Sequence, residues 1–331
     1  MAPPDPKIFD ENQVTASPSA DAAPPAAPPA PDPSDHQAVG IQVLRDLLRI
    51  EDRPNRVRRV LRIWESKVSM AIRVRDLEGA EAWMRGVTDS ADTPPQHAEA
   101  VAASIAALSR PALIDDLLVW LVDHQAVDRA AGLFAEWGAP IVSRMIDLMT
   151  VDDPPVNRRH MVDVLSHIGR SDSRLLTPHA GDHRWFVVRN LAIALGRSGR
   201  LATIPTLRTV GEHADARVRV EAVRGLAAID PEASLPDVMG ALADPDPRVR
   251  GVAVSLLRAC PSPQVISRVT DLVMNEKVHA DQAERLVEVI AERREEAARE
   301  ALETIATTRG RKGAPKPVRS AARRSLAGRK P

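Results

Sequence analysis

Two histidines that enclose an aspartate have the types and the spacing of a metal site. His179 and His183 are four residues apart, with Asp182 between them, and on one helix their side chains would share a face and could bind a zinc ion. Gly181 lies inside this interval and Pro178 precedes it, and both types are more common in loops than in helix interiors. We therefore expect a loop here and assign no metal ligand.

Catalytic and cofactor-binding patterns are absent from the rest of the sequence. It contains no glycine-rich phosphate-binding loop and no His-Glu-x-x-His zinc motif. The single cysteine, Cys260, falls at the end of a predicted helix, where we interpret it as a small buried side chain rather than a nucleophile. One cysteine excludes an internal disulfide and is typical of a reducing compartment. We expect neither enzyme activity nor a cofactor.

Three arginines in successive segments are the remaining candidates. Arg189, Arg219 and Arg250 could form a basic stripe that contacts the phosphates of a nucleic acid. Asp215 and Asp246, however, precede Arg219 and Arg250 by four residues, a spacing at which opposite charges on a helix neutralise each other. Pairs that reach the next repeat would have the same effect, so we predict a structural ladder of charges. Its members are Asp182, Arg189, Asp215, Arg219, Asp246 and Arg250.

A repeat of 31 residues determines which elements carry these charges. Residues 215–219 read Asp-Ala-Arg-Val-Arg, and residues 246–250, 31 positions later, read Asp-Pro-Arg-Val-Arg. Apolar positions such as Leu207 and Val238 keep the same step. Self-similarity at such a period is typical of a stacked array of small structural units. Since the chain has no Tyr and only three Phe, and strands favour aromatic residues, each unit is predicted to be a helical hairpin.

The composition divides the chain into four segments. Residues 1–35 are rich in Pro and Ala, carry six acids and one lysine, and are predicted to be a disordered tail. Helical-hairpin patterns fill residues 36–122, and the repeat array is predicted over residues 123–308. Residues 309–331 carry nine Lys and Arg and no acid, and they include a predicted capping helix. No run of about 18 apolar residues is present, so we expect no membrane span.

The repeated unit resembles the HEAT repeats of the short bacterial kind, also called phycobilisome-lyase-type HEAT-like repeats. The resemblance rests on an Asp-x-Arg-Val-Arg opening, then Ala-x-x-x-Leu and a second helix, and it is strong over residues 182–275. Residues 185–190, Trp-Phe-Val-Val-Arg-Asn, are similar to a variant opening in bacterial proteins of this family. The family implies an all-α, right-handed α-solenoid whose second helices line the concave face. It also implies binding, usually of a protein, and we expect a cytoplasmic scaffold.

Two other functions are compatible with HEAT-like repeats. A DNA-binding protein or an alkylpurine DNA glycosylase of this type presents Trp, Asp and Arg on a basic concave face. The second helices near residues 201–212 and 233–243 are not basic, which favours a protein partner. Bilin lyases share the repeat name, but a shared fold does not establish a shared activity.

The predicted binding face lies on the second helices near residues 201–212, 233–243 and 264–275. Its charges are mixed in sign, which suits a protein partner better than a phosphate backbone. The candidate residues are Arg208, Glu212, Asp237, Arg268 and Asp271.

The basic C-terminal segment has two interpretations. It could be a solvated capping helix, since array ends need polar outer faces, and this is the interpretation that we favour. It could also be an accessory contact for an acidic target: the chain's own tail, a nucleic acid or an anionic membrane surface. The segment has no aromatic residue for base stacking, so any nucleic-acid binding would be weak and non-specific. The accessory residues would be Arg319, Arg323 and Arg324.

Overall fold

The computed structural model describes residues 33–89, 93–275, 280–309 and 313–328. All regular elements in these ranges are helices, which confirms the all-α fold. The predicted disordered tail lies outside the described residues except for its last three positions, which begin the helix α1 (Pro33–Ile50). The chain divides into two units, residues 1–40 and residues 41–331, and every contact described below lies within the second unit.

Residues 41–123 form consecutive helices that share an apolar core. Pro54 and Pro111 begin two of them, at a position where proline sacrifices no helical hydrogen bond. The indole of Trp64 is fully buried and donates to the carbonyl oxygen of Trp83 (2.6 Å), so both tryptophans serve packing. The helices after α1 are α2 (Pro54–Arg73), α3 (Leu77–Thr88), the 3₁₀ turn η1 (Pro95–His97), α4 (Ala98–Leu108) and α5 (Pro111–Asp123).

The middle of the chain is less regular. Asn157 begins its longest helix by accepting the backbone N–H of His160 (3.1 Å), as an N-cap does. His179 lies in a 3₁₀ turn and His183 follows it in a loop, so the two histidines share no α-helix. The elements are η2 (Val127–Ala130), α6 (Ala131–Trp137), α7 (Ala139–Met149), α8 (Arg158–Ser171), η3 (Ser173–Leu175) and η4 (Thr177–Gly181).

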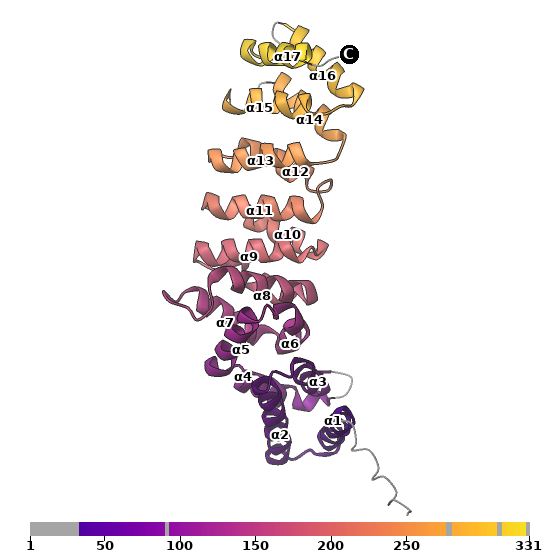
Figure 1. Cartoon of the computed structure of the whole chain (residues 1–331), viewed down its shortest axis with the longest axis vertical. Coiled ribbons are helices and arrows are strands. Elements are labelled where there is room, and N and C mark those ends of the chain that lie inside the picture. Colours follow the sequence, from indigo (N-terminus) through magenta and orange to yellow (C-terminus); the bar gives the residue numbers. More distant parts are fainter. Residues whose placement is uncertain (1–32, 90–92, 276–279, 310–312, 329–331) are drawn as a thin grey trace, which may run out of the picture. The chain divides into compact units, whose positions relative to one another are not determined.

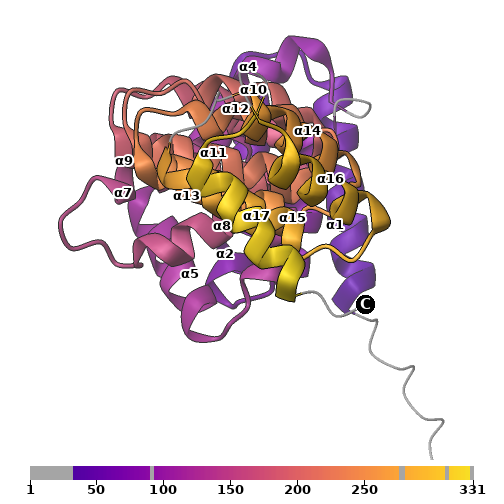
Figure 2. The same cartoon turned by 90° about the horizontal axis from the view of Figure 1, so that it is seen from above.

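From residue 185 onwards the chain is a stack of two-helix units (Figure 1). The first helices are α9 (Trp185–Ser198), α11 (Ala216–Ile229), α13 (Pro247–Ala259), α15 (Ala280–Ala291) and α17 (Lys316–Gly328). The second helices are α10 (Ile204–Val210), α12 (Leu235–Gly240), α14 (Gln264–Met274) and α16 (Glu296–Thr307), with short turns η5 (Leu201–Thr203) and η6 (Ala241–Ala243). Seen along the stack, α10, α12 and α14 lie on one side and α9, α11 and α13 on the other (Figure 2). This arrangement is an α-solenoid.

Successive first helices pack on one another, and the closest packing joins α9 and α11. Gly196 on α9 faces Gly225 on α11 so closely that a Cβ on Gly196 would lie 2.6 Å from the Cα of Gly225. Glycine is therefore required for this approach of two helix backbones. None of the described helices is both long and apolar enough to cross a membrane.

Candidate functional site

Asp215 and Asp246 bind the arginine two positions later in the sequence, not the arginine four positions later. Asp215 accepts the backbone N–H of Arg217 (2.8 Å) and two bonds from its guanidinium, Nε at 3.0 Å and Nη2 at 2.6 Å. The predicted pairing of Asp215 with Arg219 is therefore wrong, as is that of Asp246 with Arg250. Both aspartates cap their helices from an extended backbone, so their carboxylates turn toward the first-turn N–H groups. The same Asp-x-Arg bonds occur at residues 172–174, 182–184 and 246–248.

Electrostatics accounts for the ionisation of these aspartates. Hydrogen bonds from Arg217 lower the pKa of the Asp215 carboxyl to about 2. Arg184 lowers the pKa of Asp182 to about 2, and Arg248 does the same for Asp246. All three carboxylates are therefore charged and paired at neutral pH, which leaves no excess charge on them for a ligand.

An ion pair connects neighbouring repeats, and its acid is not part of the 31-residue pattern. Arg219 binds the Asp244 carboxylate through Nε and Nη2, both at 2.7 Å, and donates Nη1 to the carbonyl oxygens of His213 and Ala214 (2.9 Å). Residues 213 and 275, one repeat away from Asp244, are His and Asn. Because the acid does not recur with the period, no sequence signal identifies it.

The other two ladder arginines also bind within the chain. Arg189 reaches from α9 to Glu221 on α11 (3.1 Å). Arg250 donates Nη1 to the carbonyl oxygens of Asp244 (3.1 Å) and Pro245 (3.0 Å). The Arg189 contact joins neighbouring units, and the Arg250 contacts hold the segment that precedes α13. Both favour the structural interpretation of the ladder arginines, which stays a prediction until binding is measured.

Two residues of the predicted binding face pair with each other. Arg208 on α10 binds Asp237 on α12 through two hydrogen bonds, Nε to Oδ1 at 3.0 Å and Nη2 to Oδ2 at 3.1 Å. The remaining candidates, Glu212 after α10 and Arg268 and Asp271 on α14, are exposed. A partner could displace the Arg208–Asp237 pair at little cost, because such exposed pairs contribute at most about 1 kcal/mol.

The accessory basic residues bind their own chain. Arg319 donates to the carbonyl oxygen of Ala314, and Arg323 donates to that of Ala306 (3.0 Å). Arg324 forms an ion pair with Glu284 (3.6 Å). The contacts of Arg323 and Arg324 hold α17 on α16 and α15, and they favour the capping interpretation of the C-terminal segment over the accessory contact.

A groove of about 660 Å³ between α8 and α9 combines positive charge with aromatic surface. We call it the arginine groove; it is defined by Arg158, Arg159, Trp185, Phe186, Arg189 and Arg197. Asp152 is the only acid among its lining residues. The predicted variant opening at residues 185–190 supplies the aromatic wall, whereas no pattern in the sequence identifies Arg158 and Arg159.

The arginines of this groove differ in how their charge is balanced. Arg189 is paired with Glu221, and Arg197 is paired with Asp163 (2.6 Å). Arg158 donates to the backbone carbonyls of Met149 and Val151 (3.0 Å each), which hold it in place without neutralising it. Within the ranges that the structure describes, neither Arg158 nor Arg159 forms an ion pair.

The aromatic wall of the groove is held from the next unit. The Arg217 guanidinium lies 3.3 Å from the centroid of the Trp185 ring, a cation–π contact from α11. Phe186 meets the same ring edge-on, with 6.0 Å between ring centroids. Trp185 is thus fixed in position, and it and Phe186 remain partly exposed to the groove.

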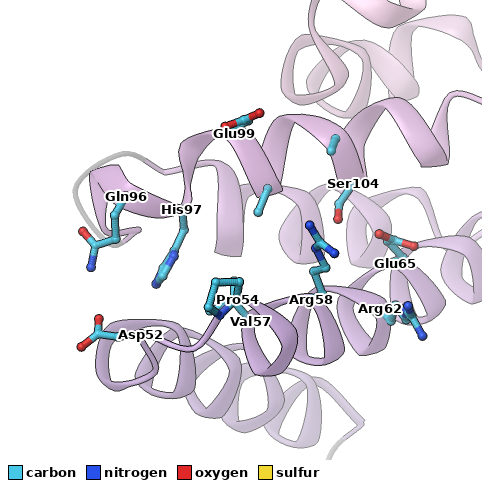
Figure 3. A pocket seen from close by; sticks show the side chains of 12 residues that line it. Asp52, Pro54, Val57, Arg58, Arg62, Glu65, Gln96, His97, Glu99 and Ser104 are labelled. Atoms are coloured by element: carbon cyan, nitrogen blue, oxygen red, sulfur yellow. The ribbon is translucent and has the colours of Figure 1, made fainter.

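A second groove, between α2 and α4, has balanced charge. Figure 3 shows Arg58 of α2 extending toward Ser104 of α4 in this groove. Its volume is about 530 Å³, and three acids (Asp52, Glu65 and Glu99) offset the two arginines Arg58 and Arg62. Since attraction and repulsion cancel here, the arginine groove is the stronger candidate for a charged ligand.

Comparison with known proteins supports the repeat architecture. Residues 210–286 match the family model described as HEAT repeats, so this part of the chain carries HEAT repeats, as the resemblance implied. No curated protein matches the chain. A crystal structure of an engineered protein is similar to it over 87% of this chain and 95% of that chain, with 17% identity and a TM-score of 0.21. The family match, and not this weak likeness, supports the assignment.

Proposed function

We propose that this chain is a non-catalytic scaffold that binds a protein partner, with the arginine groove as its anchoring site. The observation that carries the proposal is the placement of Arg158 and Arg159, which form no ion pair in the described residues, beside the partly exposed rings of Trp185 and Phe186. Arginine and tryptophan are the residue types that most often dominate the binding energy of protein interfaces.

The chemistry of the groove indicates the kind of segment that it would bind. A carboxylate can bind a guanidinium through two hydrogen bonds, and an apolar side chain next to it would pack on Trp185 and Phe186. We therefore expect an acidic segment that also contains a large apolar residue. Glu212, Arg268 and Asp271 on the predicted binding face would supply weaker peripheral contacts.

The resemblance to short bacterial HEAT repeats and the single cysteine support a bacterial cytoplasmic protein, which is part of the same proposal. The alternative is a HEAT-like DNA-binding protein or glycosylase, in which Arg158 and Arg159 would contact phosphates. The two functions differ in the ligand that depends on Arg159, so one variant can separate them.

The test uses the full chain as bait in a bacterial lysate, with bound proteins identified by mass spectrometry. Arg159→Glu should reduce capture of the specific partner by tenfold or more, because it places a like charge opposite the partner's carboxylates. Arg129→Glu, which changes another exposed arginine outside the groove, is the matched control and should retain the partner. Arg268→Glu measures the contribution of the predicted binding face.

A parallel measurement decides between protein and DNA. The same three variants are titrated against a fluorescent DNA duplex, with and without an alkylated base. Binding or base release that Arg159→Glu abolishes, together with no protein whose capture depends on Arg159, would overturn the scaffold proposal in favour of the DNA-binding alternative.

A further inference from the structure

The N-terminal helices expose an unusual share of apolar surface. Nine large apolar side chains are exposed among the described residues, and six of them lie between residues 43 and 74. Large contiguous apolar patches are rare on monomeric proteins and often mark a binding site. The six are Val43, Leu47, Ile50, Ile63, Met70 and Val74.

Three of these residues form one line on the outside of α2. Ile63, Met70 and the C-cap residue Val74, which follows α2, are spaced by seven and four positions and therefore lie on one face. They are 51%, 61% and 61% exposed. The opposite face of α2 carries its core residues, among them Trp64 and Val68, which are fully buried. The outer line is thus a second apolar surface that packing does not require.

Cations flank this line on both sides. At 100° per residue, Arg56 and Lys67 lie on or beside one edge of it, and Arg59 and Arg73 lie along the other edge. α2 contains six cations in all and only one acid, Glu65. Arg56 is paired with Glu51 (3.4 Å), whereas Arg59 and Arg73 form no ion pair within the described part of the chain.

Charge complementarity selects the occupant of this surface. A second copy of the chain would bring one basic face against another, and like charges would repel. A nucleic acid would neutralise the arginines but would leave Ile63, Met70 and Val74 against water or phosphate. An anionic bilayer offers phosphates to the cations and acyl chains to the apolar line, which is the arrangement found in interfacial helices.

We propose that α2 binds the surface of membranes that contain anionic lipids, with Ile63, Met70 and Val74 inserted at the boundary of headgroups and acyl chains. The apolar line is about 16 Å long, at 1.5 Å for each of the eleven steps from Ile63 to Val74, so α2 can lie in the plane of the interface. This contact is separate from the arginine groove and would place the scaffold on a membrane without a membrane-spanning helix.

The test is co-sedimentation of the full chain with vesicles of phosphatidylcholine, with and without phosphatidylglycerol. The wild type should bind the anionic vesicles and release them as salt rises. Arg59→Glu/Arg73→Glu should weaken binding by about tenfold or more, since each surface cation is worth roughly fivefold in affinity. Ile63→Ser/Met70→Ser should weaken it similarly, because the inserted apolar area is lost.

Matched controls change the same residue types elsewhere. Leu201→Ser removes an exposed apolar side chain of another region, which is 64% exposed, and Arg129→Glu reverses another exposed arginine. Both should bind like the wild type, and circular dichroism should show that all variants are folded, since every changed side chain is exposed.

Two results would overturn the proposal. Equal binding to neutral and anionic vesicles, or no binding to either, would show that the basic face does not select anionic lipids. Full binding by Ile63→Ser/Met70→Ser, with loss in the charge variant, would show a contact with phosphates alone and would point to a soluble polyanion. Neither result bears on Arg159, so the scaffold proposal stands or falls separately.

Discussion

The arginines of the repeats and those of α2 are used in different ways. In the repeats, Arg217 and Arg219 each bind a carboxylate, and Arg219 binds it across the boundary between two units. On α2, Arg59 and Arg73 point outward and form no ion pair within the described residues. The number of arginines therefore does not identify a binding surface in this protein, whereas the partner of each guanidinium does.

The largest expected effect is at the C-terminal end of the second unit, where the arginines bind their own chain. Removal of residues 309–331 should lower the free energy of unfolding by about 4 kcal/mol, because α17 buries Val318, Ala321 and Ala322 and covers α16. Urea unfolding followed by circular dichroism measures this change. An unchanged midpoint of urea unfolding would contradict the capping interpretation. It would favour an accessory electrostatic contact through Arg319, Arg323 and Arg324.

The close stacking of the repeats can be broken at one glycine. Gly196→Ala should cost about 2–3 kcal/mol, because its Cβ would lie 2.6 Å from the Cα of Gly225, where backbone must move. Gly240→Ala is the matched control, since nothing lies within 4 Å of its Cβ position. Thermal unfolding of both variants is the measurement. Equal melting temperatures would mean that α9 and α11 can move apart to accept the added Cβ without loss of stability.

Three arginine variants compare the two regions directly. Arg219→Ala should cost about 2 kcal/mol, because it leaves the nearly buried Asp244 carboxylate without its ion pair. Arg217→Ala should cost less, about 1 kcal/mol, since it removes a partly exposed pair with Asp215 and a surface cation–π contact with Trp185. Arg59→Ala should leave stability unchanged. If Arg219→Ala kept the melting temperature and abolished binding of a partner, the assigned roles would be reversed.

Acid titration gives the smallest effect. The pKa values of Asp182, Asp215 and Asp246 are lowered to about 2 in the folded chain, below the value of about 3.9 expected when unfolded. Their contribution is therefore complete above about pH 4 and is lost as the pH falls toward 2. Asp215→Asn should flatten the acid unfolding curve in this window, and Glu212→Gln serves as an exposed control. A curve with the same slope as the wild type would contradict the assignment.

The sequence predicted the solenoid well because its evidence is local. Apolar spacing and proline at helix starts concern residues within a few turns of one another, and the 31-residue step only repeats this local pattern. The Asp-x-Arg bonds are local too, yet the predicted partner of Asp215 was wrong. We expected Asp215 to lie within the helix, four residues before Arg219. Its backbone is extended instead, and Asp215 is the N-cap residue before α11.

The candidate site was less predictable than the fold. Trp185 and Phe186 were visible as a variant opening, but the groove also needs Arg158 and Arg159 from the start of α8. The predicted binding face was located on the second helices, where the structure shows that Arg208 and Asp237 bind each other. Side chains on different helices meet only after the units have stacked, so single-sequence spacing does not reveal them.

The helical hairpins and their 31-residue repeat could be read from the sequence, because they depend on backbone preferences and on the spacing of apolar residues along the chain. The stacking of the helices determines which arginines are paired within the chain and which can bind another molecule. Arg219 meets Asp244 25 residues away, across two units, while Arg59 has no such neighbour among the described residues. The physical reason is that an ion pair requires two side chains within about 4 Å, and stacking sets that distance.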